Sequence, residues 1–286
     1  MSVAPVSASP RPLLVVLGCG FTGSAAARLA IDQGRRVIGT LRHASEPGRA
    51  VPQEVELHVA PALTADLVEA IVPHGAEVLV TFPPDGLTDA RVAPSLGRAR
   101  SIAYISTTGG YGDHRGHVDE ETPVDPSSPR AATRLEAERV WRAAGAVVLR
   151  AAGIYGPGRG LHRRLLAGTY RVPGDGSRVV SRVHVEDLAR LALAALERGS
   201  PGEVFVVADD TPVPQIVAVR GLCAMLGVEV PASVPLEEAA ETLRHDRVVD
   251  NHRVRERLGV TLRFPSWREG FAHCLAVEEN GQRAGG

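Results

Sequence analysis

The stretch Leu13-Leu-Val-Val-Leu-Gly-Cys-Gly-Phe-Thr-Gly23 decides the fold of this chain. An apolar run of strand length ends in a glycine-rich turn, and the helix-forming run 24–30 follows at once. The turn has the spacing G-x-G-x-x-G, which gives a tight bend, a bare backbone that a pyrophosphate can approach, and close contact between helix and strand. The first amides of the helix favour an anion at the same place. We therefore predict a dinucleotide site; the alternative is a tight turn that holds no ligand.

Strand and helix patterns alternate from residue 13 to about residue 207. Such alternation is typical of right-handed βαβ units, in which helices cover both faces of a parallel sheet. We therefore predict an α/β fold, a Rossmann-like doubly wound parallel sheet. Further strands are expected at 36–41, 55–59, 77–82, 101–106, 146–150 and 203–207, and further helices at 64–72, 89–100, 130–144 and 185–198.

The domain organisation follows from where this alternation ends. Residues 1–12 are rich in Pro, Ser and Ala and are interpreted as a flexible tail. Residues 13–155 are expected to form a dinucleotide-binding domain, which the segment at about 183–207 completes. Segments 156–182 and 208–279 are expected to form a smaller substrate lobe over the carboxyl ends of the strands, where open α/β sheets bind ligands.

Composition narrows the function classes. The 286 residues carry a net charge of −1, so no overall basic field attracts nucleic acid or an anionic membrane. All 32 basic side chains are arginine, which excludes any mechanism that needs a lysine. The three cysteines suit a reducing compartment and have no metal-ligand spacing, so we expect no metal. The chain has no signal-peptide pattern and no run of about 18 apolar residues, and the expected location is the cytoplasm.

The end of the second expected strand indicates which dinucleotide binds. An NAD site has an acidic residue about 20 positions after the glycine turn, which binds the ribose hydroxyls. Here the strand ends in Arg42 and His43. A guanidinium can hold a 2′-phosphate through two charge-assisted hydrogen bonds, whereas a carboxylate would repel it. We therefore favour NADP(H) over NAD(H); the alternative is that Arg42 is a solvated loop residue.

Later segments carry further motifs, among them a strand-end Thr-Thr-Gly-Gly-Tyr-Gly segment, a Leu-Arg…Tyr-Gly-Pro-Gly segment and a His-Val-Glu-Asp-Leu-Ala helix start. The segments are Ile105–Gly112, Leu149–Gly158, Arg182–Ala189, Gly202–Ala208 and Arg255–Gly270. In this order they resemble the extended short-chain dehydrogenase/reductases, the NAD-dependent epimerase/dehydratase family.

The resemblance implies hydride transfer with a Ser/Thr hydroxyl and a Tyr-x-x-x-Lys pair. In such a pair the tyrosine exchanges a proton with the substrate oxygen, and the lysine lowers the tyrosine's pKa. Thr107 falls on the hydroxyl position, while the tyrosine position holds Arg130 and the lysine position Arg134. Arginine keeps its proton in proteins, so Arg130 cannot replace the tyrosine, although Arg134 could still hold ribose hydroxyls. The chain therefore resembles the family's atypical members, which keep the coenzyme fold and lose the tyrosine.

Three functions remain open at this point. An oxidoreductase or epimerase could use another proton donor, Tyr111 or His114, although packing and solvation are the ordinary roles of these two side chains. A catalytically silent NADP(H)-binding sensor or scaffold is the second function, and a purely structural fold is the third. The candidate catalytic residues are Thr107, Tyr111, His114 and Arg134, and the candidate coenzyme-binding residues are Gly18, Gly20, Phe21, Thr22, Gly23, Arg42, His43, Phe82, Pro83, Arg134 and Ile154.

The expected partner is a small-molecule substrate with a carbonyl or hydroxyl group, or one that resembles a nucleotide sugar. Arginines crowd residues 150–182 and favour an anionic substrate. Family members that use nucleotide sugars hold the diphosphate with arginines in this region, and we select Arg182 and Tyr155 as candidate substrate-binding residues. The alternative is that arginine is frequent here because it supplies every positive charge of the chain.

A homodimer is favoured slightly over a monomer. Helices 89–100 and 130–144 correspond to the pair that many family members use for a dimer interface. Glu136 and Glu138 are interpreted as surface or interface charges. The apolar stripe that could line this interface, or pack on the sheet instead, consists of Leu135, Val140 and Trp141.

Overall fold

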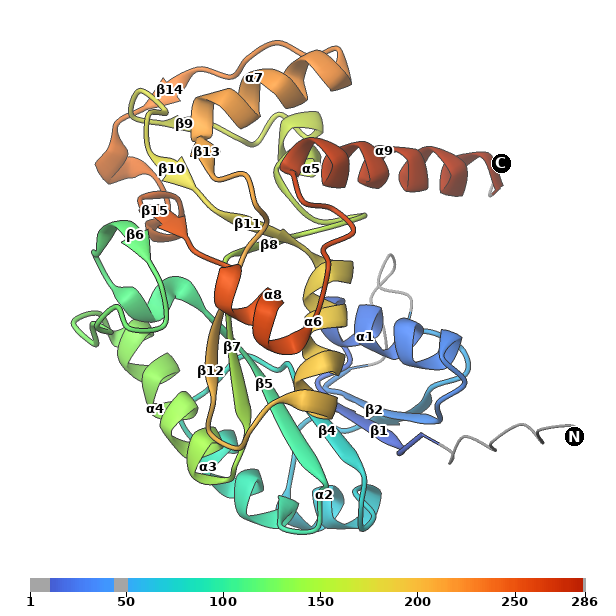
Figure 1. Ribbon diagram of the computed structural model, residues 1–286. Helices are drawn as coiled ribbons and strands as arrows, with labels where there is room; N and C mark the ends of the chain where they lie inside the picture. The colour runs from blue at the N-terminus through green and yellow to red at the C-terminus, as the bar shows by residue number, and fades with distance from the viewer. Residues whose placement is uncertain (1–10, 44–50, 285–286) are drawn as a thin grey trace, which may run out of the picture.

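The computed structural model describes residues 11–43 and 51–284 (Figure 1), so residues 1–10 of the expected tail lie outside the described residues. Its central strands are β1 (Leu14–Leu17), β2 (Val37–Leu41), β3 (Glu56–Val59), β4 (Glu77–Val80), β5 (Ser101–Thr107), β7 (Val147–Ala151) and β12 (Val204–Val207). They form one parallel sheet in the order β12-β7-β5-β4-β1-β2-β3. The predicted Rossmann-like fold is confirmed. The order reverses between β1 and β4, and such a point opens a ligand crevice at the carboxyl ends of the strands.

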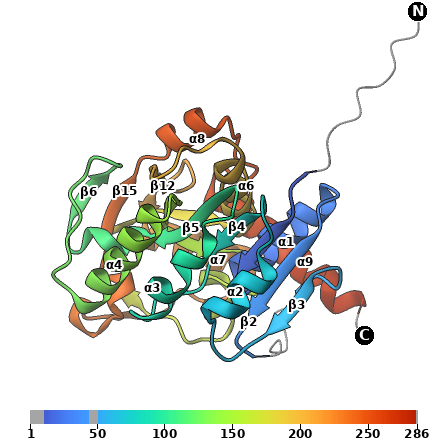
Figure 2. The same ribbon diagram turned by 90° about the horizontal axis from the view of Figure 1, so that it is seen from below.

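Helices cover both faces of this sheet (Figures 1 and 2). They are α1 (Phe21–Asp32), α2 (Ala65–Ile71), α3 (Thr88–Val92), α4 (Pro129–Ala143) and α6 (Val185–Arg198). Successive residues of β1 point to opposite faces. Leu14 and Val16 pack with α1 and α6, whereas Val15 and Leu17 pack with α2 and α4. All four side chains are buried, as expected of a parallel strand that is covered on both sides.

A smaller lobe lies at one end of the sheet (Figure 1). Its elements are α5 (Leu161–Leu166), α7 (Gln215–Leu226), α9 (Trp267–Ala284), β8 (Gly153–Tyr155), β9 (Val172–Pro173), β10 (Val179–Val180), β11 (Arg182–His184), β13 (Val213–Pro214) and β14 (Ser233–Val234). Its core joins Tyr155 and Tyr170 to Leu222, Trp267 and Phe271 from the C-terminal part of the chain. No helix among the described residues is both long and apolar enough to cross a membrane.

Two parts of the C-terminal segment lie against the main domain. α8 (His252–Leu258) places Val254 and Leu258 in the core that α6 shares with the sheet. β15 (Asp246–Val249) pairs in parallel with β6 (Arg115–Val118), a strand that follows β5 along the chain. Sequence analysis did not predict this pair, because both strands are short and carry polar residues without a clear alternation.

The expected helix 89–100 is shorter in the structure. α3 ends at Val92, and the chain continues as the 3-10 helix η1 (Ala93–Leu96). Pro94 lies in η1; it has no N–H to donate, and its ring clashes with the carbonyl four residues before it, so the α-helix does not continue. The other 3-10 helices are η2 (Thr108–Tyr111), η3 (Leu236–Glu238) and η4 (Glu241–Leu243).

One face of α4 packs on the sheet. Trp141 is fully buried, stacks on Tyr104 with 5.8 Å between the ring centroids, and donates from Nε1 to Asp89 Oδ1 at 2.7 Å. Trp141 therefore cannot line a dimer interface, and packing on the sheet is its observed role. Glu138 is buried as well, contrary to the expected surface position, because it pairs with Arg150 of β7.

Candidate functional site

The glycine turn after β1 has the geometry that a pyrophosphate needs. Gly18 has a φ of +96°, and a Cβ there would lie 2.7 Å from the backbone nitrogen of Phe82. A Cβ on Gly23 would lie 2.7 Å from the Gly18 carbonyl oxygen, so glycine allows α1 to pack closely on β1. Gly20 has open space around it, with no atom closer than 3.9 Å to an added Cβ. These features fit a dinucleotide at the start of α1.

A cavity of about 660 Å³ opens at this turn. Its wall is formed by the turn itself, by the residues that end β2, and by the residues that follow β4. The structure thereby brings together eight of the candidate coenzyme-binding residues: Gly18, Gly20, Phe21, Thr22, Arg42, His43, Phe82 and Pro83. Gly23 lies behind the wall, where it is buried between α1 and β1.

One carboxylate shares this first cavity with Arg42. Asp85 Oδ2 lies 3.8 Å from the Arg42 guanidinium. Partial burial raises the pKa of Asp85, but hydrogen bonds from Thr88 and Leu87 and the charge of Arg42 outweigh it and lower the pKa to about 2. Asp85 is therefore ionised at neutral pH and offsets part of the positive charge of Arg42.

A second cavity, of about 880 Å³, continues from the first and reaches into the smaller lobe. The two cavities share Thr22, Thr81 and Pro83 in their walls. The remaining wall comes from the ends of β5 and β7, from α4, and from the lobe. Five candidate residues from the sequence line it: Thr107, Arg134, Ile154, Tyr155 and Arg182.

The catalytic side of the second cavity combines β5 with α4. Thr107 ends β5, and its side-chain oxygen accepts a hydrogen bond from the Gly109 amide at 3.2 Å. Arg130 and Arg134 follow each other by about one helical turn on α4 and line the same wall. The residues at the family's tyrosine and lysine positions therefore both face the cavity next to Thr107.

Tyr111 and His114 line neither of the two cavities. Tyr111 is fully buried; its hydroxyl donates to the Asp119 carbonyl at 2.8 Å and accepts from Arg150 at 3.0 Å. Burial raises its pKa, which opposes ionisation of the phenol. His114 is exposed, with Nε2 3.0 Å from the His117 carbonyl oxygen. The structure does not bring these two candidates to Thr107, because η2 turns Tyr111 into the protein and His114 out of it.

Behind Thr107 lies a buried ion pair that sequence analysis did not identify. Arg150 NH2 donates to Glu138 Oε2 at 2.8 Å, and Ser106 Oγ donates to Glu138 Oε1 at 2.5 Å. The two charged side chains are 8% and 3% exposed. Because β5, α4 and β7 each contribute one of these residues, the ion pair fixes the helix that carries Arg134 against the strand that carries Thr107.

The lobe contributes a buried polar wall. Arg182 is 7% exposed, and no carboxylate of the described residues lies within 4.0 Å of its guanidinium. Burial lowers the pKa of Arg182. Burial also raises the pKa of the nearby Asp209 to about 7, against a hydrogen bond from the Thr211 amide and the charge of Arg182. The hydroxyl of Tyr155 and Oε1 of Gln215 have no hydrogen-bond partner among the described residues, so this wall has unused polar atoms.

His245 is a cavity residue that sequence analysis did not select. It stands between η4 and β15 and lines the second cavity together with Arg130. Burial lowers its pKa to about 4; Arg247 and Arg130 act in the same direction, and Glu241 and Asp113 oppose them. The imidazole is therefore neutral at neutral pH. No local pattern around residue 245 indicates this position, because the pairing of β15 with β6 brings it to the cavity.

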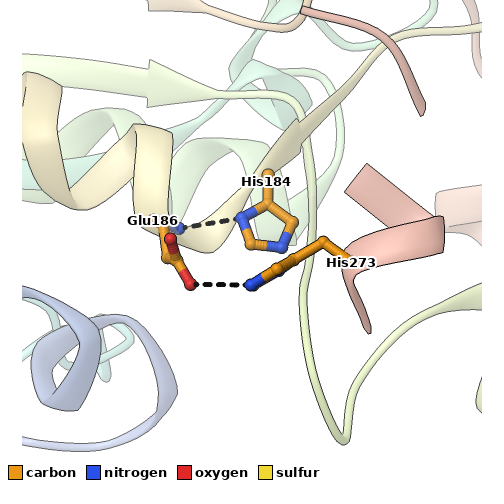
Figure 3. Close-up of side chains that lie close together, drawn as sticks. All are labelled: His184, Glu186 and His273. Carbon is orange, nitrogen blue, oxygen red and sulfur yellow. Dashed lines mark hydrogen bonds and ion pairs between the residues drawn. The ribbon is translucent and has the colours of Figure 1, made fainter. Parts of the chain in front are cut away.

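A cluster of two histidines and one glutamate lies at the start of α6 (Figure 3). His184 Nδ1 accepts from the Glu186 amide at 3.2 Å, and the Glu186 carboxylate contacts His273 Nε2 at 3.7 Å and Arg263 at 2.8 Å. Burial lowers the pKa of His184 to about 3. The carboxylate already holds a guanidinium, and His184 uses Nδ1 as an acceptor, so this donor set is poorly suited to a metal ion.

Comparison with known proteins agrees with this architecture. Residues 87–208 match the NAD dependent epimerase/dehydratase family. A 3-diazoavenalumate denitrifying reductase from Streptomyces sp is 31% identical over 226 residues, which cover 73% of this chain and 68% of that protein. A dTDP-glucose 4,6-dehydratase from Neisseria gonorrhoeae is 30% identical over 183 residues, which cover 54% of this chain and 53% of that protein.

Solved structures extend the likeness over almost the whole chain. A functionally unknown conserved protein from Silicibacter pomeroyi is 33% identical, with a TM-score of 0.79 over 94% of this chain and 100% of that one. MoeE5 in complex with UDP-glucose and NAD has a TM-score of 0.78 over 94% of this chain and 99% of that one; at 20% identity it shows the fold alone. From the parallel sheet, the glycine turn and these relatives, we conclude that the chain belongs to the NAD-dependent epimerase/dehydratase family of extended short-chain dehydrogenase/reductases.

Proposed function

We propose that this protein is an NADP(H)-dependent oxidoreductase or epimerase that acts on a small anionic substrate without the usual tyrosine. The observation that carries the proposal is the pair of continuous cavities, one at the glycine turn and one lined by Thr107, Arg134 and Arg182. A coenzyme that crosses from the first cavity to the second would bring its nicotinamide to the substrate.

The first cavity offers groups for each part of the coenzyme. The turn from Gly18 to Thr22 would hold the pyrophosphate, and Arg42 with His43 would hold the 2′-phosphate. Arg134 would hold the nicotinamide ribose. When bound, the nicotinamide supplies the hydride acceptor or donor; the protein's own residues bind, orient and exchange the proton.

The charge of the second cavity supports an anionic substrate. One carboxylate, Glu241, lines it, against six guanidinium groups. Buried Arg182 lies beside the unused polar atoms of Tyr155 and Gln215, and a carboxylate or phosphate would satisfy such donors. The arginine residues of this wall are Arg130, Arg134, Arg159, Arg163, Arg164 and Arg182.

A silent NADP(H)-binding sensor is the second candidate function. The arginine at the tyrosine position favours it, because Arg130 cannot exchange a proton with a substrate oxygen. A large polar cavity with a hydroxyl at Thr107 favours the enzyme instead. The two functions differ in one measurable way, since only the enzyme changes the absorbance of the reduced nicotinamide when a substrate is added.

Coenzyme titration and a substrate panel test the proposal together. We expect NADPH to bind more tightly than NADH, and Arg42→Glu to weaken NADPH binding by about tenfold while NADH binding changes little. Fluorescence of the reduced nicotinamide measures both affinities. Equal affinities for the two coenzymes would contradict the NADP(H) preference. We expect turnover with NADP⁺ within a panel of hydroxy acids, phosphorylated alcohols, UDP-glucose and dTDP-glucose; coenzyme binding without turnover would favour the sensor.

A further inference from the structure

The segment that carries His245 is held firmly on the turn that follows Thr107. Arg247 is 4% exposed, and its guanidinium donates to the carbonyl oxygens of Thr108 at 2.7 Å and His114 at 3.1 Å, and also to that of Gly112. One side chain of the C-terminal segment thus binds three backbone acceptors of the loop after β5.

Two further contacts fix the same segment from the other side. Ser181 Oγ donates to the Arg247 carbonyl at 3.1 Å and accepts from the Val249 amide at 2.9 Å. The Asp246 carboxylate accepts from the Val179 amide at 2.9 Å. His245 directly precedes this anchored strand, so its backbone cannot move far from the cavity wall.

The imidazole of His245 has the chemistry that its surroundings lack. Arg130 and Arg134 keep their protons, and Tyr111 is sealed in the core. Among the described residues, none forms a hydrogen bond or ion pair with the His245 side chain. A substrate oxygen in the second cavity would therefore not compete with a protein group for the ring nitrogens.

We propose that His245 exchanges the proton with the substrate oxygen in this site, from the opposite wall of the cavity to the position where the family has its tyrosine. This inference rests on the proposed oxidoreductase function. Thr107 would hold the same oxygen through its hydroxyl, and Arg130 would neutralise an anionic group of the substrate close to the imidazole.

In the oxidation direction the step balances as follows. The substrate's O–H bond breaks, and its proton passes to a ring nitrogen of neutral His245, which becomes imidazolium. The C–H bond at the same carbon breaks, and its electron pair leaves with the hydrogen as hydride to the oxidised nicotinamide coenzyme. The C=O bond forms, and the imidazolium then releases its proton to water. Reduction is the reverse, with the imidazolium as proton donor.

The charges that face His245 decide when it can act. Arg247 and Arg130 disfavour the imidazolium, Glu241 and Asp113 favour it, and burial disfavours it most. An anion bound at Arg130 would cancel part of the positive field and raise the pKa towards the useful range. Substrate binding would thus strengthen the base that its own oxidation requires.

A titration of the imidazole tests the placement without turnover. In the full chain labelled with ¹⁵N-histidine, His245→Gln assigns the His245 signals by nuclear magnetic resonance. We expect its pKa well below that of exposed His252, and a higher pKa in Arg130→Gln and after addition of inorganic phosphate. A pKa that responds to neither change would show that the ring does not share the cavity with Arg130, and the proposal would fail.

Kinetics test the role itself, with the panel substrate that the wild type oxidises. His245→Gln should lower kcat by about 100-fold or more, with the coenzyme affinity unchanged. His252→Gln, at a side chain that is 80% exposed on α8, is the matched control. Adding Arg130→Tyr to His245→Gln should restore part of kcat, with a basic limb in its pH profile. Wild-type turnover in His245→Gln overturns the proposal alone, whereas a wild type that binds no coenzyme overturns the proposed function.

Discussion

The coenzyme half and the substrate half of this site are built in different ways. The coenzyme half comes mainly from one turn, residues 18–23, in which three glycines have three separate steric reasons to be glycine. The substrate half combines Thr107, Arg134, Tyr155 and His245, which are far apart in the sequence. Local backbone geometry therefore creates the first half, whereas long-range contacts must hold the second half together.

The largest expected effect concerns the contacts that hold the substrate half. Glu138→Gln would leave the buried Arg150 guanidinium without its counter-charge, and we expect a loss of about 3 kcal/mol in the free energy of unfolding. Glu136→Gln on the same helix is the matched control, because its ion pair with Arg139 is exposed and should contribute less than about 1 kcal/mol. Urea unfolding measures both changes. Equal losses in the two variants would mean that the buried pair has no special structural role.

The next effect concerns the coenzyme half. Gly18→Ala would place a Cβ 2.7 Å from the Phe82 nitrogen at a φ of +96°, so we expect the turn to shift and NADPH affinity to fall by about 100-fold, or about 2.7 kcal/mol. Gly34→Ala has a similar φ of +76° and nothing within 4 Å of the new Cβ. It should lower stability by about 1 kcal/mol and leave the affinity unchanged. Fluorescence titration compares the two, and an unchanged affinity in Gly18→Ala would contradict the assigned turn.

The smallest expected effect sharpens the comparison at the 2′-phosphate end. Asp85→Asn removes the carboxylate beside Arg42 but keeps an oxygen that can accept from the Leu87 and Thr88 amides. With one repulsive charge gone, NADPH affinity should rise by about threefold to fivefold. NADH, which has no 2′-phosphate, serves as the control ligand and should change less. A similar gain for both coenzymes would show that Asp85 does not face the 2′ position.

Much of the fold could be predicted from the sequence, because parallel strands buried on both faces appear as continuous apolar runs. Leu14–Leu17 and Val147–Ala151 are examples, and the expected strands there agree with the structure. The helix expected over 89–100 was too long, since the effect of Pro94 depends on where the helix begins. Trp141 had two compatible roles, and only the position of Tyr104 and Asp89 decides between them.

The same difference divides the candidate site. The lining role of Arg42 and His43 follows from their position directly after a strand that pairs with β1. Tyr111 and His114 were reasonable proton donors by sequence position, yet η2 directs one into the core and the other into solvent. His245 had no sequence signal, since a short polar strand gives no periodic pattern.

By itself, the sequence determined the parallel α/β fold, the glycine turn and the absence of a lysine, because each depends on neighbouring residues or on composition alone. The tertiary structure decided which side chains share the second cavity. Arg247 joins the C-terminal segment to the loop after β5, and Glu138 with Arg150 joins α4 to the sheet. Such contacts link residues 12 to 139 positions apart, and their free energies depend on burial and charge that only the folded chain creates.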